Sequence, residues 1–399
     1  MKISVLAPFQ KNKDGIPRAA EELISKLCEA DNVESVSVIV AKKERDYVSP
    51  VLLQSEKVSL FVVRSFLLPW TLLQAIKLYK RSDVLLIFTY PCYFFDPSSL
   101  LFSFQLLVKF RILPGTKWVQ MLYDFVFYTC PEDMRSFKEN MLFKVWKKYF
   151  VHVPVRYVAI SESTKKEATS YWGPSTTEIT VIPLGSFITP KSPRTHFGSK
   201  KILTVSCISP RKNQLRLIKA FELVHRNNPS SGAELMIVGR KRKDIPGLDS
   251  TLRDIRNRNK GIKITLAGYL TDSEIMSLYE EADIFVYPSL YEGFGLPVLE
   301  AMACGCPIIA SNVFSLPEVV GEAGMLVDPY DVEMIARALS TVLENDELKR
   351  EMSRKGIEQA QKFSWERAGV ELLAVCREVA ERRSQRGGGR VQILDKRND

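Results

Sequence analysis

The sequence lacks the residues on which metal and disulfide chemistry usually depend. Its 399 residues include only three histidines, and these show no spacing typical of a zinc site. No Asp-x-Asp motif occurs in the chain. The seven cysteines include no Cys-x-x-Cys pair, and their odd number favours a reducing cytosol over a disulfide scaffold. The sequence therefore predicts a cytoplasmic protein with no bound metal and no cofactor.

Long apolar runs are also lacking. No segment is long enough to cross a bilayer, and the N-terminal MKISVLAPFQKNK becomes charged too early for a signal peptide. The net charge is +10, which suits an acidic partner such as nucleic acid, anionic lipid or a phosphorylated ligand. A merely solubilising surface explains the same charge equally well.

Short apolar runs alternate with amphipathic stretches throughout the chain. The runs are rich in Val and Ile and apolar on both faces, which is typical of parallel strands buried between helices. Such alternation predicts two doubly wound α/β domains. The expected strands are 3–9, 36–40, 58–63, 84–90, 118–123, 157–160 and 179–182 in the first half, and 202–206, 235–238, 264–266, 284–287, 308–310 and 325–327 in the second.

Composition marks the expected domain boundaries. Residues 183–201 are rich in Pro, Ser, Gly and Thr, so we expect one domain over 1–185, a linker over 186–201 and a second domain over 202–366. A helix over 367–383 is expected to pack back toward the first domain. The charged, glycine-rich tail over 384–399 has no apolar period and is expected to be disordered.

The stretch YPSLYEGFGLPVLEAMACG (287–305) places two glutamates around a glycine turn. Gly293 and Gly295 lie between a predicted strand and a predicted helix over 296–303, at the sheet edge where open α/β folds bind ligands. The helix N-terminus offers partial positive charge to a phosphate. Glu292 and Glu300 then suit a sugar and a ribose on either side of a diphosphate. The simpler interpretation is a tight turn followed by a solvated Glu300.

A second turn adds positive charge at the same edge. In LTVSCISPRKNQLRLIKAF, Arg211 and Lys212 follow the first strand of the second domain and precede an amphipathic helix. Two cations at this place would neutralise a diphosphate without a metal. An isolated Arg-Lys pair is more often ordinary surface charge, and the nearby glycine turn favours the binding interpretation.

The residues of these two turns make the chain from about residue 202 to 366 resemble the family 4 glycosyltransferases, whose signature is Glu-x7-Glu. The resemblance implies a retaining hexosyltransferase with two facing Rossmann-like domains, the GT-B architecture, with a cleft between them. It implies a nucleoside-diphosphate sugar (GDP- or UDP-linked) as donor, a glycan or polyprenol-linked acceptor in polysaccharide or glycolipid synthesis, and no nucleic acid partner. Retention without an evident nucleophile implies front-face attack.

The resemblance also assigns site residues. Glu292 would hold the transferred sugar and, with Asp124, would form the catalytic pair. Glu300 would hold the ribose. The remaining donor-binding residues would be Gly15, Arg211, Lys212, Tyr269, Gly293, Phe294, Gly295 and Leu296.

The chain departs from the family pattern at three places. Ser206-Cys207 stand where many members have a glycine and an arginine, Tyr123-Asp124 replace His-Asp, and the first loop has one glycine instead of two. A catalytically inactive partner subunit is therefore one alternative function. Another GT-B enzyme, such as a nucleotide-sugar epimerase, is the second.

Two basic stretches suggest a membrane surface. Residues 65–81 and 136–156 mix aromatic and aliphatic residues with lysines, among them Lys144, Lys147 and Lys148. Such stretches bind anionic lipid at a membrane interface, which would place the protein on the cytosolic face of a membrane. Helices that pack on a sheet and solvate their lysines explain the same pattern.

Overall fold

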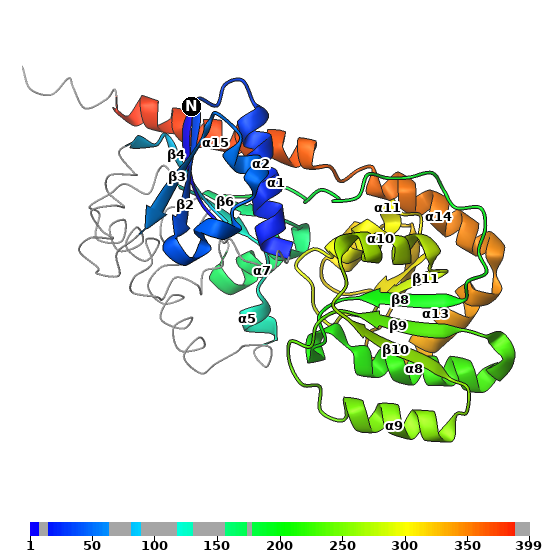
Figure 1. Ribbon diagram of the computed structural model, residues 1–399. Coiled ribbons are helices and arrows are strands. Elements are labelled where there is room, and N and C mark those ends of the chain that lie inside the picture. The colour runs from blue at the N-terminus through cyan, green and yellow to red at the C-terminus, as the bar shows by residue number, and fades with distance from the viewer. Residues whose placement is uncertain (8–14, 64–80, 89–117, 131–155, 174–177, 388–399) are drawn as a thin grey trace, which may run out of the picture. The chain divides into compact units, whose positions relative to one another are not determined.

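The computed structural model describes residues 1–7, 15–63, 81–88, 118–130, 156–173 and 178–387. The chain forms two compact units (Figure 1). The first contains 1–123, 135–184 and 365–399, and the second contains 124–134 and 185–364. Each unit is built on one wholly parallel sheet, so the predicted α/β fold with two sheets is confirmed.

The first unit has a seven-stranded sheet in the order β3-β2-β1-β4-β5-β6-β7. Its central strands are buried on both faces, as their Val- and Ile-rich sequences predict. The strands are β1 (Lys2–Leu6), β2 (Ser35–Ala41), β3 (Val58–Val63), β4 (Val84–Ile87), β5 (Trp118–Leu122), β6 (Arg156–Ala159) and β7 (Ile179–Val181). The described helices are α1 (Gly15–Glu29), α2 (Pro50–Leu53), α7 (Glu162–Trp172) and α15 (Trp365–Gly387), with a 3-10 turn at Lys42–Tyr47.

The second unit has a six-stranded sheet in the order β10-β9-β8-β11-β12-β13. Its strands are β8 (Lys201–Val205), β9 (Glu234–Val238), β10 (Lys263–Gly268), β11 (Ile284–Tyr287), β12 (Ile308–Ser311) and β13 (Gly324–Val327). Its helices are α8 (Gln214–Asn227), α9 (Leu248–Arg258), α10 (Asp272–Glu281), α11 (Leu296–Ala303), α12 (Leu316–Val320), α13 (Val332–Glu344) and α14 (Asp346–Ala360), with 3-10 turns at Pro210–Lys212 and Pro229–Ser231; the unit also includes α5 (Val126–Thr129).

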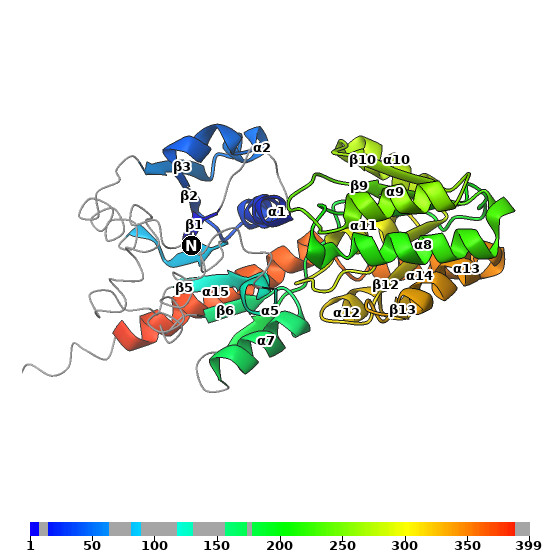
Figure 2. The same cartoon turned by 90° about the horizontal axis from the view of Figure 1, so that it is seen from below.

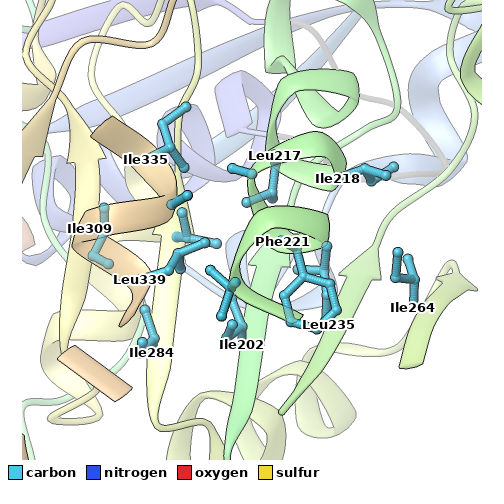
Figure 3. Packing of buried hydrophobic residues seen from close by; sticks show 14 of the residues in the cluster. Ile202, Leu217, Ile218, Phe221, Leu235, Ile264, Ile284, Ile309, Ile335 and Leu339 are labelled. Atoms are coloured by element: carbon cyan, nitrogen blue, oxygen red, sulfur yellow. The ribbon is translucent and has the colours of Figure 1, made fainter. Parts of the chain in front are cut away.

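The core of the second unit forms where α8 and α13 pack on one face of the sheet. Leu217 and Phe221 of α8 lie beside Ile335 and Leu339 of α13 over the central strands (Figure 3). The opposite face of the sheet holds α10, where the ring of Tyr279 meets Phe285 of β11 edge-on at 5.4 Å. Helices therefore cover both faces, and the polar groups of the site can gather only at the ends of the strands.

The segment predicted as a linker lies in the second unit. Residues 186–200, all of them described, form neither helix nor strand. The fully buried Asp283 accepts hydrogen bonds from the N–H groups of Gly198 and Lys200, both at 3.2 Å. Lys349, also buried, pairs with the same carboxylate at 3.5 Å. Buried charge therefore holds this irregular segment against the second sheet.

Helix α15 returns to the first unit, where it contacts α1, β4 and β5. Lys26 of α1 pairs with Glu366 at 3.1 Å, and Arg156 of β6 pairs with Glu378 at 3.2 Å. The helix extends to Gly387, so 384–387 of the predicted disordered tail are helical. No described helix has the length and apolar character that crossing a membrane requires.

Candidate donor site

Four strand-end turns of the second sheet are joined by backbone hydrogen bonds. Ile208, just before the Arg-Lys turn, donates to the carbonyl of Arg240 at 2.8 Å, and Gly239 donates to the carbonyl of Gly268 at 2.7 Å. Leu290, after β11, donates to the carbonyl of Arg211 at 2.8 Å. The turns after β8, β9, β10 and β11 therefore form one continuous edge.

Gly239 permits this close approach. Its φ is +140°, and a Cβ built there would lie 2.0 Å from the carbonyl oxygen of Ser206. Any other residue would force the turns after β8 and β9 apart.

The glycine turn before α11 is held from behind by a serine. Ser315 donates from Oγ to the carbonyls of Glu292 at 2.9 Å and Phe294 at 2.8 Å. Gly295 has a φ of +113°, and an added Cβ would meet Leu316 at 2.7 Å. No side chain caps the N-terminus of α11, which begins at Leu296. Pro297 has no N–H, and those of Val298 and Leu299 donate to the carbonyl of Gly295 at 2.9 and 3.2 Å, so at this helix start the N–H of Leu296 is the group left for water or an anion.

Glu292 joins the two turns through a largely buried ion cluster. Its Oε1 lies 2.5 Å from Nζ of Lys212, and its Oε2 lies 3.3 Å from Nη1 of Arg211. Ser289 donates to the same carboxylate at 2.5 Å, and Lys212 also donates to the hydroxyl of Tyr287 at 2.7 Å. The side chains of the three charged residues are only 9–11% exposed. Two cations and one carboxylate leave the cluster with one net positive charge.

The environment keeps this carboxylate ionised. Burial by itself raises the pKa of Glu292, but the charges of Lys212 and Arg211 outweigh burial and bring the pKa down to about 2. Burial lowers the pKa of Lys212, and Arg211 lowers it further, while Glu292 acts in the opposite direction. Glu292 is thus an acceptor of hydrogen bonds at neutral pH and has no proton to donate.

Glu300 lies on α11 and is oriented from the neighbouring helix. The hydroxyl of Tyr279, on α10, lies 3.2 Å from its Oε2. Tyr279 is fully buried, whereas Glu300 is half-buried. The carboxylate therefore faces the α10 side of α11 and is more accessible than Glu292.

The remaining predicted residues occupy different settings. Phe294 is buried against Phe363, so only its backbone belongs to the glycine turn. Tyr269 is 61% exposed and lies in the turn after β10. Gly293 stands at the centre of the glycine turn, beside Glu292.

Two predicted residues come from the first half of the sequence. Gly15 begins α1, and the loop before it lies outside the described residues. Asp124 follows β5 and accepts a hydrogen bond from the N–H of Val126 at 3.1 Å. The next residue, Phe125, donates to the hydroxyl of Tyr291 at 2.5 Å, so Asp124 begins a short segment of the second unit that reaches the residue before Glu292.

Sequence reasoning missed the residues that support the cluster. Ser289, Ser315 and Tyr287 hold Glu292, its turn and Lys212, and none was singled out. The sequence could have indicated Ser289, because this residue lies three positions before Glu292 in the same turn. Ser315 lies in a different turn, and nothing in the sequence indicated its contact with the glycine turn. Among the described residues, no group of three or more His, Cys, Asp or Glu could hold a metal ion.

The second unit matches a known family. Residues 189–359 fit the family model described as glycosyl transferases group 1. O-antigen chain mannosyltransferase B of Escherichia coli is 37% identical over 171 residues, which are 43% of this chain and 44% of that protein. D-inositol 3-phosphate glycosyltransferase of Corynebacterium glutamicum (strain R) is 32% identical over 183 residues, 44% of this chain and 43% of that protein. The chain thus matches less than half the length of these curated relatives.

Solved structures share the fold over nearly the whole chain. Sucrose-phosphate synthase of Thermosynechococcus elongatus superposes with a TM-score of 0.70 at 19% identity, covering 95% of this chain and 98% of that one. HepE of Anabaena, solved with UDP and glucose, gives 0.65 at 19% identity, covering 96% and 100%. At such identity these likenesses define the fold alone. The class is therefore a two-sheet α/β protein of GT-B architecture, in which residues 189–359 match the group 1 glycosyl transferase model.

Proposed function

We propose that the chain is a retaining glycosyltransferase that moves a sugar from a nucleoside-diphosphate sugar to a glycan or lipid-linked acceptor without a metal ion. The observation that carries the proposal is the largely buried cluster of Arg211, Lys212 and Glu292 at the glycine turn. Its net positive charge, together with the uncapped N-terminus of α11, suits a diphosphate.

The cluster suits the charge that develops during transfer. When the bond between C1 of the sugar and the diphosphate oxygen breaks, negative charge grows on the diphosphate, and Arg211 and Lys212 are positioned to stabilise it. Glu292, ionised and adjacent to both cations, accepts hydrogen bonds from hydroxyls of the sugar. The acceptor oxygen bonds to C1 on the face from which the diphosphate departs, and its proton passes to the departing phosphate.

Glu300 completes the donor site in this proposal. The hydroxyl of Tyr279 holds its carboxylate in one orientation, and a fixed acceptor suits the hydroxyls of a ribose. Relatives named as mannosyltransferases make mannose the first sugar to test, and polysaccharide or glycolipid synthesis the first process.

The test is donor binding by the full chain. Nucleoside diphosphates are titrated by calorimetry into wild type, Lys212→Ala and the control Lys219→Ala, each with magnesium and with a chelator. Lys219 lies on α8 and is exposed, so its loss should change little. We expect Lys212→Ala to weaken nucleoside diphosphate binding at least 10-fold, because the variant loses one charge-assisted contact. The chelator is expected to have no effect on binding. Unchanged binding by Lys212→Ala contradicts the site, and binding lost in chelator contradicts metal independence.

Attachment to a membrane surface is a separate part of the proposal. Lys144, Lys147 and Lys148 lie outside the described residues, so the argument rests on sequence alone: each cation near an anionic surface contributes about 1 kcal/mol. We expect salt-sensitive sedimentation with anionic liposomes, lost when these three lysines are changed to Glu. Equal sedimentation of both proteins would show that the lysines only solvate a helix.

A further inference from the structure

The hydroxyl of Tyr291 joins two segments that are distant in the sequence. Tyr291 directly precedes Glu292, is fully buried, and accepts a hydrogen bond from the N–H of Phe125 at 2.5 Å. Phe125 directly follows Asp124, and residues 124–130 belong to the second unit. One hydrogen bond therefore connects the neighbours of Glu292 and Asp124, the two residues that the family resemblance assigns to the catalytic pair.

This hydrogen bond orients the backbone of Asp124. The N–H of Phe125 lies in the same planar peptide unit as the Cα and the carbonyl of Asp124, so an acceptor that holds the N–H also sets the orientation of that plane. The carboxylate is held as well, because its Oδ1 accepts from the N–H of Val126 at 3.1 Å. Asp124 is half-buried, so part of this residue is open to solvent in its fixed position.

The backbone of Tyr291 is held by the ion cluster. Its carbonyl accepts from Nη1 of Arg211 at 2.6 Å and from Oγ of Ser289 at 3.3 Å. The same guanidinium pairs with Glu292. Tyr291 therefore has its backbone at the proposed diphosphate site and its hydroxyl at the segment that begins with Asp124.

The ring of Tyr291 is held by a neighbouring turn. Phe314 meets it edge-on, with the ring centroids 4.6 Å apart. Phe314 has a φ of +53°, which a bulky residue rarely adopts, and Ser315 after it donates to the carbonyl of Glu292 at 2.9 Å. These two residues directly precede α12, which packs on β12 and α14 (Figure 2). Packing therefore fixes the ring, and with it the position of the hydroxyl.

We propose that Tyr291 is a positioning residue for Asp124, and that its hydroxyl sets where this carboxylate lies relative to Glu292 during sugar transfer. The inference rests on the proposed function and adds a residue outside the predicted site. A phenylalanine would fill the same space and keep the contact with Phe314, but it would lose the acceptor for Phe125. Misplacing a reacting group by about 1 Å can slow a reaction about 100-fold, so a small shift of Asp124 should slow transfer without weakening donor binding.

The experiment separates turnover from binding in the full-length protein. Tyr291→Phe is compared with wild type and with Tyr330→Phe, which removes the hydroxyl of an exposed tyrosine. Calorimetry measures the affinities for GDP and UDP, and turnover is measured as release of GDP from GDP-mannose or of UDP from UDP-glucose, with water as the acceptor. We expect Tyr291→Phe to lower turnover roughly 10-fold while both affinities change less than about twofold. Unchanged turnover, or a parallel loss of turnover and binding, contradicts the positioning role.

A double-mutant cycle tests whether Tyr291 acts through Asp124. Asp124→Asn should lower turnover about 100-fold or more. If the hydroxyl works by placing that carboxylate, adding Tyr291→Phe to Asp124→Asn should cause no further loss, because the two residues then act as a unit. A double variant that loses about another 10-fold, or normal turnover by Asp124→Asn, overturns the proposal.

Hydrogen exchange reports the same contact without turnover. In Tyr291→Phe the amides of residues 124–130 should exchange up to about 10-fold faster, because one hydrogen bond is lost. The amides of β11 should stay as protected as in wild type. Equal protection of residues 124–130 in both proteins overturns the positioning role, even where no donor is turned over, and faster exchange in β11 as well would show a general loss of stability instead.

The outcomes separate this inference from the proposed function. A wild type that binds GDP or UDP, together with a Tyr291→Phe variant that behaves like it, overturns the role of Tyr291 and leaves the glycosyltransferase proposal standing. A wild type that binds neither nucleotide overturns the proposed function, and the role of Tyr291 in transfer with it.

Discussion

The first strand of each sheet lies at an equivalent position in the strand order, but the residues at the end of that strand differ in chemical character between the two units. In the first unit β1 lies between β2 and β4, and in the second β8 lies between β9 and β11. Each sheet therefore has a point where the strand order reverses, and such points are where open α/β sheets bind ligands. In the second unit, Arg211, Lys212 and the glycine turn lie at the point where the strand order reverses.

In the first unit, the described residues directly after β1, β4 and β5 are buried. Ala7 follows β1, Phe88 follows β4 and Tyr123 follows β5, and none is more than 4% exposed. Each of the two sheets therefore has an edge at which a ligand could bind, but the residues in the turns determine whether that edge can bind an anion. Variants in the two units can therefore test how far the donor chemistry belongs to the second unit.

The largest effect is expected from Glu292→Gln. Removing the carboxylate deletes the acceptor proposed to hold the sugar, so transfer should fall about 100-fold or more. Nucleoside diphosphate affinity should hold or rise, because Arg211 and Lys212 lose their internal counter-ion. Transfer assays and calorimetry measure the two effects, with Glu322→Gln, an exposed glutamate, as control. A parallel loss of binding and transfer would place Glu292 on the nucleotide instead.

Acid should remove the contribution of the ion cluster to stability. The pKa of Glu292 is about 2 in the folded protein, below its usual value of 4.5, so the ionised carboxylate stabilises the fold fully above pH 4.5. This stabilisation, about 3 kcal/mol, is lost as pH falls from 4.5 toward 2. Urea unfolding at pH 7 and pH 3 should show a gap between wild type and Glu292→Gln that narrows in acid. A gap that is independent of pH would contradict the ionised cluster.

Matched glycine substitutions compare the two units directly. Gly295→Ala forces a φ of +113° on alanine and a clash with Leu316, and should destabilise the protein by about 2 kcal/mol. Gly15→Ala meets no atom within 4 Å and should change stability by less than about 0.5 kcal/mol. Thermal unfolding measures both. If Gly15→Ala nevertheless abolishes transfer, its predicted role near the donor gains support; if Gly295→Ala is neutral, the turn is not held as the structure has it.

The smallest effect is expected from Tyr279→Phe. The change removes one hydrogen bond to Glu300 and should cost about 1 kcal/mol of stability. Nucleoside diphosphate affinity should fall only about threefold, because Glu300 keeps its place but loses its fixed orientation. Calorimetry checks the affinity, and Tyr330→Phe, an exposed tyrosine, is the control. A loss as large as that of Lys212→Ala would give Tyr279 a more direct role.

The sequence predicted the strands of both sheets well, because short runs rich in Val and Ile are typical of strands buried on both faces. Predicted strand 58–63 matches β3, and 284–287 matches β11, at both ends. The other strands match within a few residues where the chain is described, while residues 8–9 and 89–90 of the predicted strands lie outside the described residues. The helix predicted over 296–303 matches α11, since Pro297 and the glycines fix its start.

The pairing inside the site could not be predicted from the sequence. Arg211 and Lys212 were assigned to a diphosphate and Glu292 to a sugar, but in the structure both cations pair with Glu292. That contact joins turns 80 residues apart, and only the strand order β8-β11 brings them together. The buried Asp283 that anchors residues 198–200 escaped notice for the same reason, because its partners are distant in sequence.

The return of α15 to the first unit has a consequence for biosynthesis. The first sheet is complete at residue 184, yet α15, which packs on α1, β4 and β5, starts at residue 365. At about 5–20 residues per second, a ribosome needs roughly 10–40 s to supply the chain between them. The second unit is contiguous over 185–364 and can fold as it emerges. The first unit, although translated first, must wait with part of its apolar surface uncovered, so it is expected to be the last to finish and the more dependent on chaperones.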